Sequence, residues 1–186
     1  MRESANIIAR SHGVHHTPYE YRGAQAWGCG RQYQRVPLDV VERNIIKSYG
    51  HIPCDPSREW TFDFTTFAFA NIDKQYFYST AMAILERGVE QVEKELEPLS
   101  WWAGAAPARR GVIVDIVFKN GMNAMADKAL STLCDASKLA QIGAVIIHDA
   151  SCAREHQLPC SLNQYGSRSH YLSQMAITGE WPEWSK

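Results

Sequence analysis

One stretch limits the possible folds more than any other part of the chain: residues 61–96, TFDFTTFAFANIDKQYFYSTAMAILERGVEQVEKEL. Two runs in its first half, 61–70 and 75–79, are rich in aromatic and β-branched residues, and turn-forming residues separate them at 71–74. Such residues favour strands, and turn residues between two strand segments are typical of a hairpin. We therefore predict a β-hairpin whose second strand ends at Ser79.

A helix is predicted directly after that strand. Apolar residues and one glycine follow each other at helical spacing, namely Ile84, Leu85, Gly88, Val89, Val92 and Leu96. The first backbone N–H groups of a helix lack partners within it and can bind an anion. The polar pair Ser79-Thr80 at this junction therefore predicts a phosphate-binding site, and a plain helix cap is the alternative.

Length and composition favour one packed domain with extended ends. The chain has 186 residues, of which 45% are hydrophobic, enough for a single core. We predict a loop-rich arm over residues 1–35, an α/β domain over 36–160 and a tryptophan-containing tail over 161–186.

Charge and hydropathy limit the cellular compartments and the partners to be expected. The 19 basic and 20 acidic residues balance, so composition gives no sign of nucleic-acid or membrane binding, although a local basic groove stays possible. No apolar run reaches membrane length, and the first residues lack the apolar core of a secretion signal. We expect a cytoplasmic protein without a membrane partner.

The second half of the chain continues the alternation of predicted strands and helices. Apolar residues occupy both faces of RRGVIVDIVFKNG (109–121), which predicts a central strand. A helix is predicted over 123–140 and a third apolar strand over 144–149. Short connections between strand, helix and strand predict a parallel pair. The predicted fold class is therefore α/β (α+β), with a small mixed sheet and packed helices.

Two segments together resemble the ParB/sulfiredoxin fold. VPLDVVERN (36–44) is similar to the extended segment that opens that fold. QYFYS (75–79), leading straight into a helix, is similar to the strand that precedes the sulfiredoxin phosphate-binding turn. The likeness covers residues 36–149, and the nearest group is the Osa-type plasmid fertility-inhibition proteins. It implies a ParB/sulfiredoxin-like fold in a bacterial protein.

The resemblance also implies an activity. Proteins of the Osa group hydrolyse nucleotide and cut DNA, so the chain is expected to be an ATPase and DNase that uses ATP and a divalent metal, with Mg as the expected ion. Its expected role is to block conjugative or type IV secretion transfer of a rival element's DNA. The implied partners are the transferred DNA, expected as a single strand, and components of the secretion apparatus.

The family pattern is incomplete in this chain. Its members place a glycine-rich turn with an arginine after the YFYS-like strand, and sulfiredoxin adds a cysteine and a histidine. Residues 80–85 are Thr-Ala-Met-Ala-Ile-Leu and contain none of these. Sulfinic-acid reduction is therefore not expected, and Glu86-Arg87, two turns into the predicted helix, remain as the nearest charged pair.

Phosphoryl chemistry needs hydrogen-bond donors for phosphate, a positive charge and a carboxylate that positions a metal or water. The candidates are Glu86, Arg87 and Asp73 for catalysis, and Ser79, Thr80 and Lys74 for nucleotide or phosphate binding. Each also has a purely structural interpretation, as a helix cap, a solvated helix residue or a turn residue.

A basic groove with aromatic platforms would bind single-stranded nucleic acid. The candidate DNA-binding residues are Arg31, Arg35, Arg109 and Arg110. Two other functions stay open: a DNA-binding module without catalysis, and a non-enzymatic inhibitor that binds a secretion or coupling protein through its aromatic ends. For the second, Trp181 and Trp184 are either a partner-binding patch or residues that pack the tail onto the domain.

A last cluster concerns metal binding. His148, Cys152, His156 and Cys160 lie four residues apart and would line one side of a helix, as zinc ligands could. Pro159 interrupts that pattern, and structural zinc sites usually present closer pairs such as C-x-x-C. The metal therefore stays unidentified at the sequence level.

Overall fold

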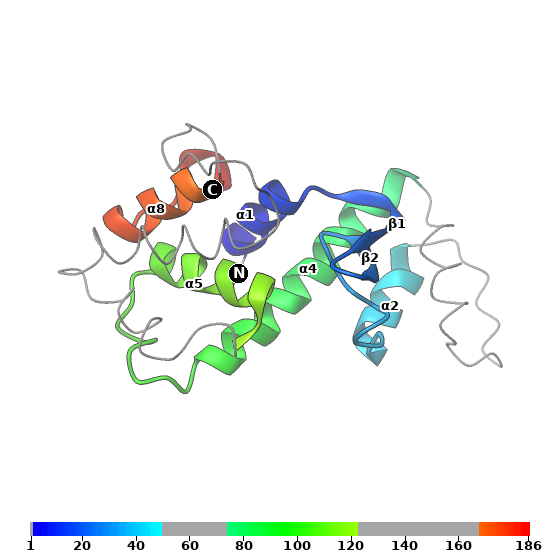
Figure 1. Ribbon diagram of the computed structural model, residues 1–186, viewed down its shortest axis with the longest axis horizontal. Helices are drawn as coiled ribbons and strands as arrows, with labels where there is room; N and C mark the ends of the chain where they lie inside the picture. Colours follow the sequence, from blue (N-terminus) through cyan, green and yellow to red (C-terminus); the bar gives the residue numbers. More distant parts are fainter. Residues whose placement is uncertain (1, 50–73, 123–167) are drawn as a thin grey trace. The chain divides into compact units, whose positions relative to one another are not determined.

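The computed structural model describes residues 2–49, 74–122 and 168–186 (Figure 1). Helices and a two-stranded antiparallel sheet occur together within these residues. The predicted class, with both α and β structure, is therefore confirmed.

The chain forms two compact units. Unit 1 comprises residues 1–7 and 89–186, and unit 2 comprises residues 8–88. The chain passes from one unit to the other within helix α1 (Arg2–His12) and again within helix α4 (Lys74–Leu96). The domain boundaries expected from the sequence, at 35/36 and 160/161, stay predictions.

Unit 2 contains the hairpin, formed by β1 (His15–Tyr21) and β2 (Ala24–Gly28). The two turn residues, Arg22 and Gly23, have φ angles of 51° and 71°, as the tight turns favoured by twisted hairpins require. Tyr21 pairs with Ala24 and His15 with Gly28, with an irregular register between His15 and Tyr19. The prediction that residues 1–35 form only a loop-rich arm is wrong, because α1 and this hairpin lie there.

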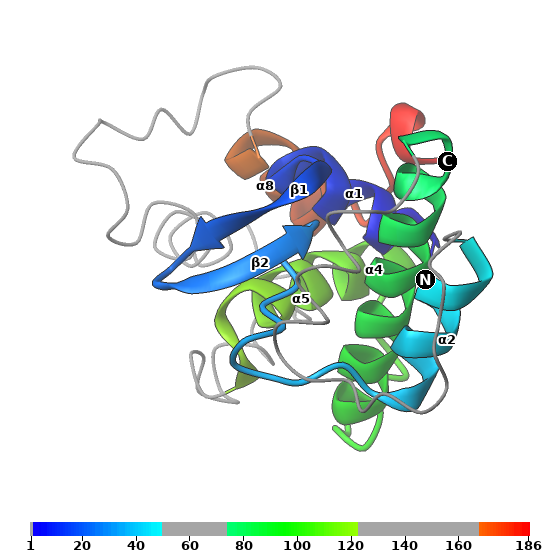
Figure 2. The same ribbon diagram turned by 90° about the vertical axis from the view of Figure 1, so that its right-hand side faces the viewer.

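The core of unit 2 lies between the hairpin, helix α2 (Val40–Tyr49) and the first part of α4 (Figure 2). Its buried members are Trp27, Tyr33, Leu38, Ile46, Ala81 and Ile84. Trp27 is fully buried, and its indole Nε1 donates to the carbonyl of His16 at 2.7 Å. That bond satisfies the one polar atom of the largest core side chain, so its burial leaves no donor without an acceptor.

A reciprocal cap starts α2. The carboxylate of Asp39 accepts from the backbone N–H of Glu42 at 2.8 Å, and the carboxylate of Glu42 accepts from the backbone N–H of Asp39 at 2.9 Å. This capping box satisfies backbone donors that a helix start otherwise leaves without partners. The extended segment expected over VPLDVVERN (36–44) is wrong from Val40 onward, where the helix starts.

Helix α4 replaces the predicted junction between a strand and a helix. Gln75–Ser79 is helical, so the second strand of the predicted hairpin is wrong. The predicted apolar stripe of this helix is confirmed as helical, and Ile84, Leu85, Val89 and Leu96 are buried. Residues 61–70, the first predicted strand, lie outside the described residues.

Unit 1 is built around α5 (Pro107–Asn120), which packs against α8 (Arg168–Thr178). The predicted central strand over 109–121 is therefore wrong. Residues 111–117 are all buried, the acidic Asp115 among them. Burial on every side of a helix produces a mainly apolar run that resembles a central strand. Pro107 at the first helical position is a normal helix start.

The tail of unit 1 is held by polar contacts. The guanidinium of Arg109 donates to the carbonyls of Ala176 (3.0 Å) and Ile177 (3.2 Å) in the last turn of α8. The side-chain amide of Asn6 donates to the carbonyl of Ser185 at 3.1 Å, within the short 3₁₀ helix Glu183–Ser185. The last residues therefore pack onto α5 and the start of α1.

Several predictions fall outside the described residues: the helix over 123–140, the strand over 144–149 and the cluster of His148, Cys152, His156 and Cys160. Among the helices that the structure describes, none is long and apolar enough to cross a bilayer.

Candidate functional site

The predicted phosphate site depended on unpaired N–H groups at Ser79 and Thr80. Within the described residues α4 begins at Lys74, so both residues lie beyond the first four, where helical N–H groups bond to carbonyls of the preceding turn. The Thr80 hydroxyl donates to the carbonyl of Tyr76 at 2.9 Å, and Thr80 is fully buried. The strand-to-helix cradle for an anion is therefore not formed there.

Of the three predicted catalytic residues, the structure gives a side-chain contact for Arg87. Arg87 lies 3.5 Å from the Asp39 carboxylate at the start of α2. Glu86 is a half-buried residue of the same helix, and Asp73 lies outside the described residues. The structure thus brings Arg87 together with Asp39 rather than with a phosphate-binding turn.

This pairing predicts a pH dependence. The backbone N–H of Glu42, followed by the charge of Arg87, lowers the pKa of Asp39. A carboxyl whose folded pKa is depressed stabilises the fold above its unfolded pKa of about 3.9, and that contribution is lost as pH falls through the lower folded value. Asp39→Asn keeps a capping side chain but cannot titrate. Its free energy of unfolding should therefore fall less steeply than that of the wild type below about pH 4.

The measurement is urea unfolding at several pH values, with Glu20→Gln, an exposed acid of unit 2, as the control. If the free energy of unfolding fell equally with pH in the wild type and in Asp39→Asn, that result would contradict the assigned role of the Asp39 carboxylate.

The four arginines proposed for DNA binding are all engaged locally. In unit 2, Arg31 forms a two-bond ion pair with Glu42, at 2.6 and 2.8 Å, and Arg35 donates to the carbonyl of Arg22 at 2.6 Å. In unit 1, Arg109 holds the end of α8, and Arg110 donates to the carbonyls of Ala103 and Ala105. DNA binding by these residues stays a prediction, and two of them belong to each unit.

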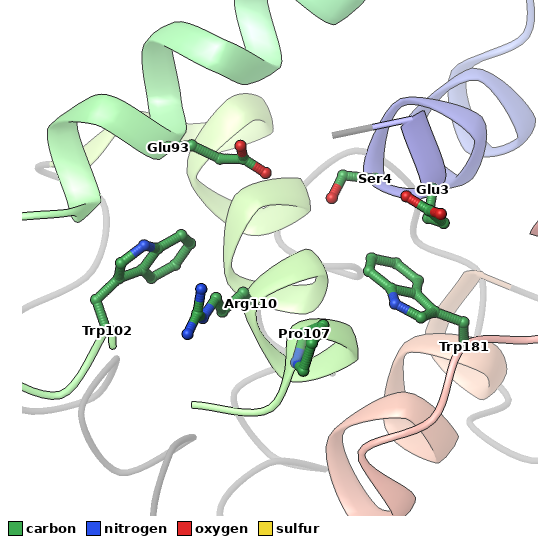
Figure 3. Close-up of a pocket in the computed structure, with 7 residues that line it drawn as sticks. All are labelled: Glu3, Ser4, Glu93, Trp102, Pro107, Arg110 and Trp181. Atoms are coloured by element: carbon green, nitrogen blue, oxygen red, sulfur yellow. The ribbon is translucent and has the colours of Figure 1, made fainter. Parts of the chain in front are cut away.

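A pocket of about 330 Å³ lies within unit 1 (Figure 3). This volume is in the range of small-ligand sites. Two indoles stand on opposite sides of it, and α5 supplies the residues between them. The lining residues are Glu3, Ser4, Glu93, Trp102, Pro107, Arg110 and Trp181. We call this the Trp102–Trp181 pocket.

Arg110 is fixed on one wall of the pocket. Its guanidinium carbon lies 5.4 Å from the centre of the Trp102 ring, a cation–π distance. Its Nε donates to the Ala105 carbonyl at 3.0 Å, and its Nη2 donates to the Ala103 carbonyl at 2.7 Å. Two backbone acceptors and one indole therefore hold the guanidinium in place.

The opposite wall depends on a glycine. A Cβ added at Gly111 would lie 2.2 Å from Cη2 and 2.6 Å from Cζ3 of Trp181. No side chain fits at that separation, so a glycine in the middle of α5 lets the Trp181 ring lie directly on the helix backbone. The tail residue Trp181 is thereby placed on the helix that also carries Arg110.

Among the described residues, no group of three or more His, Cys, Asp or Glu side chains is placed to hold a metal ion. ATP, magnesium and nuclease activity stay predictions.

No family model, curated protein or solved structure matches the chain. The resemblance to the ParB/sulfiredoxin fold therefore stays a prediction, and the strand that it placed at Gln75–Ser79 is helical in the structure.

Sequence reasoning named Trp181 and Arg110 but not the pocket they share. Trp102, Glu3, Ser4 and Glu93 belonged to no motif in the sequence. One usable signal was present in Pro107, which marks a helix start and argues against a strand over 109–121. The D-x-x-E pattern of residues 39–42 marked the start of α2 in the same way.

Proposed function

We propose that this chain acts by binding a partner protein rather than by hydrolysing nucleotide. The observation that carries the proposal is the Trp102–Trp181 pocket, in which two indoles flank a fixed guanidinium and two acidic side chains. Tryptophan and arginine are the residues that most often dominate binding energy at interfaces. Part of this arrangement is already ordered before a partner binds, which reduces the entropy that binding costs.

The expected partner follows from the resemblance to the Osa-type proteins. A secretion or coupling protein of a conjugative system is the target of such an inhibitor, and occupying it would stop transfer without any chemical step. This is the non-enzymatic alternative left open by the sequence, now given a specific surface. Ser79 and Thr80 lie inside α4 and not at a helix start, so they form no anion-binding turn. This favours the non-enzymatic function over the ATPase and DNase alternative.

The test measures conjugative transfer from donor cells that produce the protein. Wild-type protein is expected to lower the transfer frequency, and Trp102→Leu and Glu93→Lys are expected to restore it. Ile177→Ala is the matched control, because Ile177 is an exposed apolar residue of unit 1 that does not line the pocket. Circular dichroism should show that each variant is folded.

The same preparations are assayed for ATP hydrolysis and DNA cleavage against a heat-inactivated control. We expect activity no higher than that control. ATP-dependent DNA cleavage by the wild type, or full inhibition of transfer by folded Trp102→Leu and Glu93→Lys, would overturn the proposal.

A further inference from the structure

Arg110 has hydrogen-bond donors to spare. A guanidinium carries five N–H groups, and the bonds from Nε and Nη2 to the Ala105 and Ala103 carbonyls use two of them. Within the described residues, Arg110 Nη1 donates to no protein acceptor. Since the two backbone bonds hold the guanidinium in place, the Nη1 donors are fixed beside the pocket that Arg110 lines.

A second polar group lies elsewhere on the lining. Ser4 is 2% exposed, and Figure 3 shows its hydroxyl directed into the space between the indoles. No protein group in the part of the chain that the structure describes forms a hydrogen bond with this hydroxyl. Buried polar groups are normally hydrogen-bonded, so the Ser4 hydroxyl is placed to bond a ligand.

The two carboxylates of the lining are already engaged. Glu3 and Glu93 each have an interaction partner of their own, so neither calls for a cationic ligand. The Arg110 donors and the Ser4 hydroxyl, which can donate or accept, are then the polar groups on which recognition depends. A ligand that fits them presents an acceptor oxygen to the guanidinium.

We propose that the Trp102–Trp181 pocket binds a neutral carboxamide group, as in the side chain of a partner's glutamine, with Arg110 and Ser4 as its polar contacts. This inference rests on the proposed function, because it names the chemistry that the same pocket recognises in a partner. A carboxamide is planar and carries one acceptor oxygen and two N–H donors, so it can accept from Arg110 Nη1 and donate to the Ser4 oxygen. The two indoles supply apolar surface for the methylene stem.

A carboxylate of the same shape fits this lining less well. Its charge would be desolvated against two indoles, in a pocket that the carboxylates of Glu3 and Glu93 also line. An apolar group of the same length would leave the buried Ser4 hydroxyl without a partner. The neutral amide avoids both costs.

The experiment titrates the full chain with three probes of similar length: N-acetylglutamine methylamide, N-acetylglutamate methylamide and N-acetylnorleucine methylamide. Their backbone amides are identical, so a difference in affinity reports the side chain alone. Binding is followed by the NMR shifts of the indole N–H groups. The glutamine probe is expected to bind at least about fivefold more tightly than either of the other two, which is the effect of one or two hydrogen bonds.

Two variants test the assigned contacts. Ser4→Ala removes the hydroxyl, and Arg110→Lys keeps the charge but loses the fixed fork of donors. Each should weaken binding of the glutamine probe about fivefold. Ser11→Ala is the matched control in α1, because the Ser11 hydroxyl donates to the Ile8 carbonyl at 2.9 Å and does not line the pocket. Circular dichroism should show that each variant is folded.

Butyramide separates the two sources of this group, a side chain within a polypeptide and a free amide. Tighter binding of the glutamine probe than of butyramide assigns the pocket to a polypeptide side chain, and equal binding assigns it to the amide group itself. Equal affinity for the three matched probes, tighter binding of the glutamate probe, or unchanged affinity in both folded Ser4→Ala and Arg110→Lys would overturn the inference.

The outcome is separable from that of the proposed function. If the glutamine probe does not bind, yet Trp102→Leu still restores transfer, the ligand class is wrong and the binding function stands. If the probe binds and the pocket variants leave inhibition of transfer intact, the binding function fails and the carboxamide site remains.

Discussion

Replacing Glu42 by alanine should lower the free energy of unfolding of unit 2 by about 3 kcal/mol, because it leaves a partly buried arginine without its counter-charge. The Arg31 Nε and Nη2 atoms lie 2.6 and 2.8 Å from the two Glu42 oxygens, and the side chains are 22% and 7% exposed. The same substitution removes half of the capping box of α2. A loss of this size is a large share of a typical domain's stability, about 5–15 kcal/mol.

The control for this prediction removes both charges. Arg31→Met with Glu42→Leu leaves no unpaired ion, so the double variant should recover most of the stability lost in Glu42→Ala. Urea unfolding of unit 2 can be followed by the fluorescence of Trp27 after the other tryptophans are replaced by phenylalanine. A cost below about 1 kcal/mol for Glu42→Ala, typical of an exposed pair, would show that the ion pair is not structural.

Gly111→Ala is expected to destabilise the wild type and to stabilise the Trp181→Ala variant. In the wild type the new Cβ meets the Trp181 ring at 2.2 Å, and overpacking of this kind typically costs about 1–3 kcal/mol. Without that ring, alanine should gain about 1 kcal/mol over glycine through its higher helix propensity. The two effects have opposite signs, so the expected coupling energy between the two positions is about 2–4 kcal/mol.

The measurement is a double-mutant cycle by chemical denaturation. Gly104→Ala is the matched glycine control, because its added Cβ would come no closer than 3.9 Å to the atoms around it. The NMR chemical shift of the Trp181 indole should change in Gly111→Ala and stay the same in Gly104→Ala. Additive effects at positions 111 and 181 would mean that Trp181 does not lie on α5 in solution.

The sequence predicted the parts of the fold that local spacing can report. The apolar stripe of α4 at Ile84, Leu85 and Val89 appears as predicted, because helical periodicity alone defines it. The aromatic run Gln75–Ser79 led to a wrong strand prediction, since short aromatic stretches occur in strands and helices alike. The β-branched run in α5 misled for a related reason: a helix buried on all sides has no polar face to mark its period.

The candidate site could not be found by spacing at all. Glu3, Glu93 and Trp181 come from three distant segments, and their proximity is a property of packing within unit 1. Sequence reasoning left two roles open for the terminal tryptophans, packing the tail or forming a partner surface. Trp181 packs the tail, because it lies on Gly111, and it also lines the pocket that is proposed as the partner surface.

The Trp102–Trp181 pocket is proposed as a protein-binding site. This proposal is tested by calorimetric titration of the purified chain into the purified cytoplasmic part of a conjugative coupling protein, the proposed partner. We expect saturable binding that weakens at least about tenfold in Trp102→Leu and Glu93→Lys and is unchanged in Ile177→Ala. Equal affinity for all four proteins, or no binding by the wild type, would contradict it.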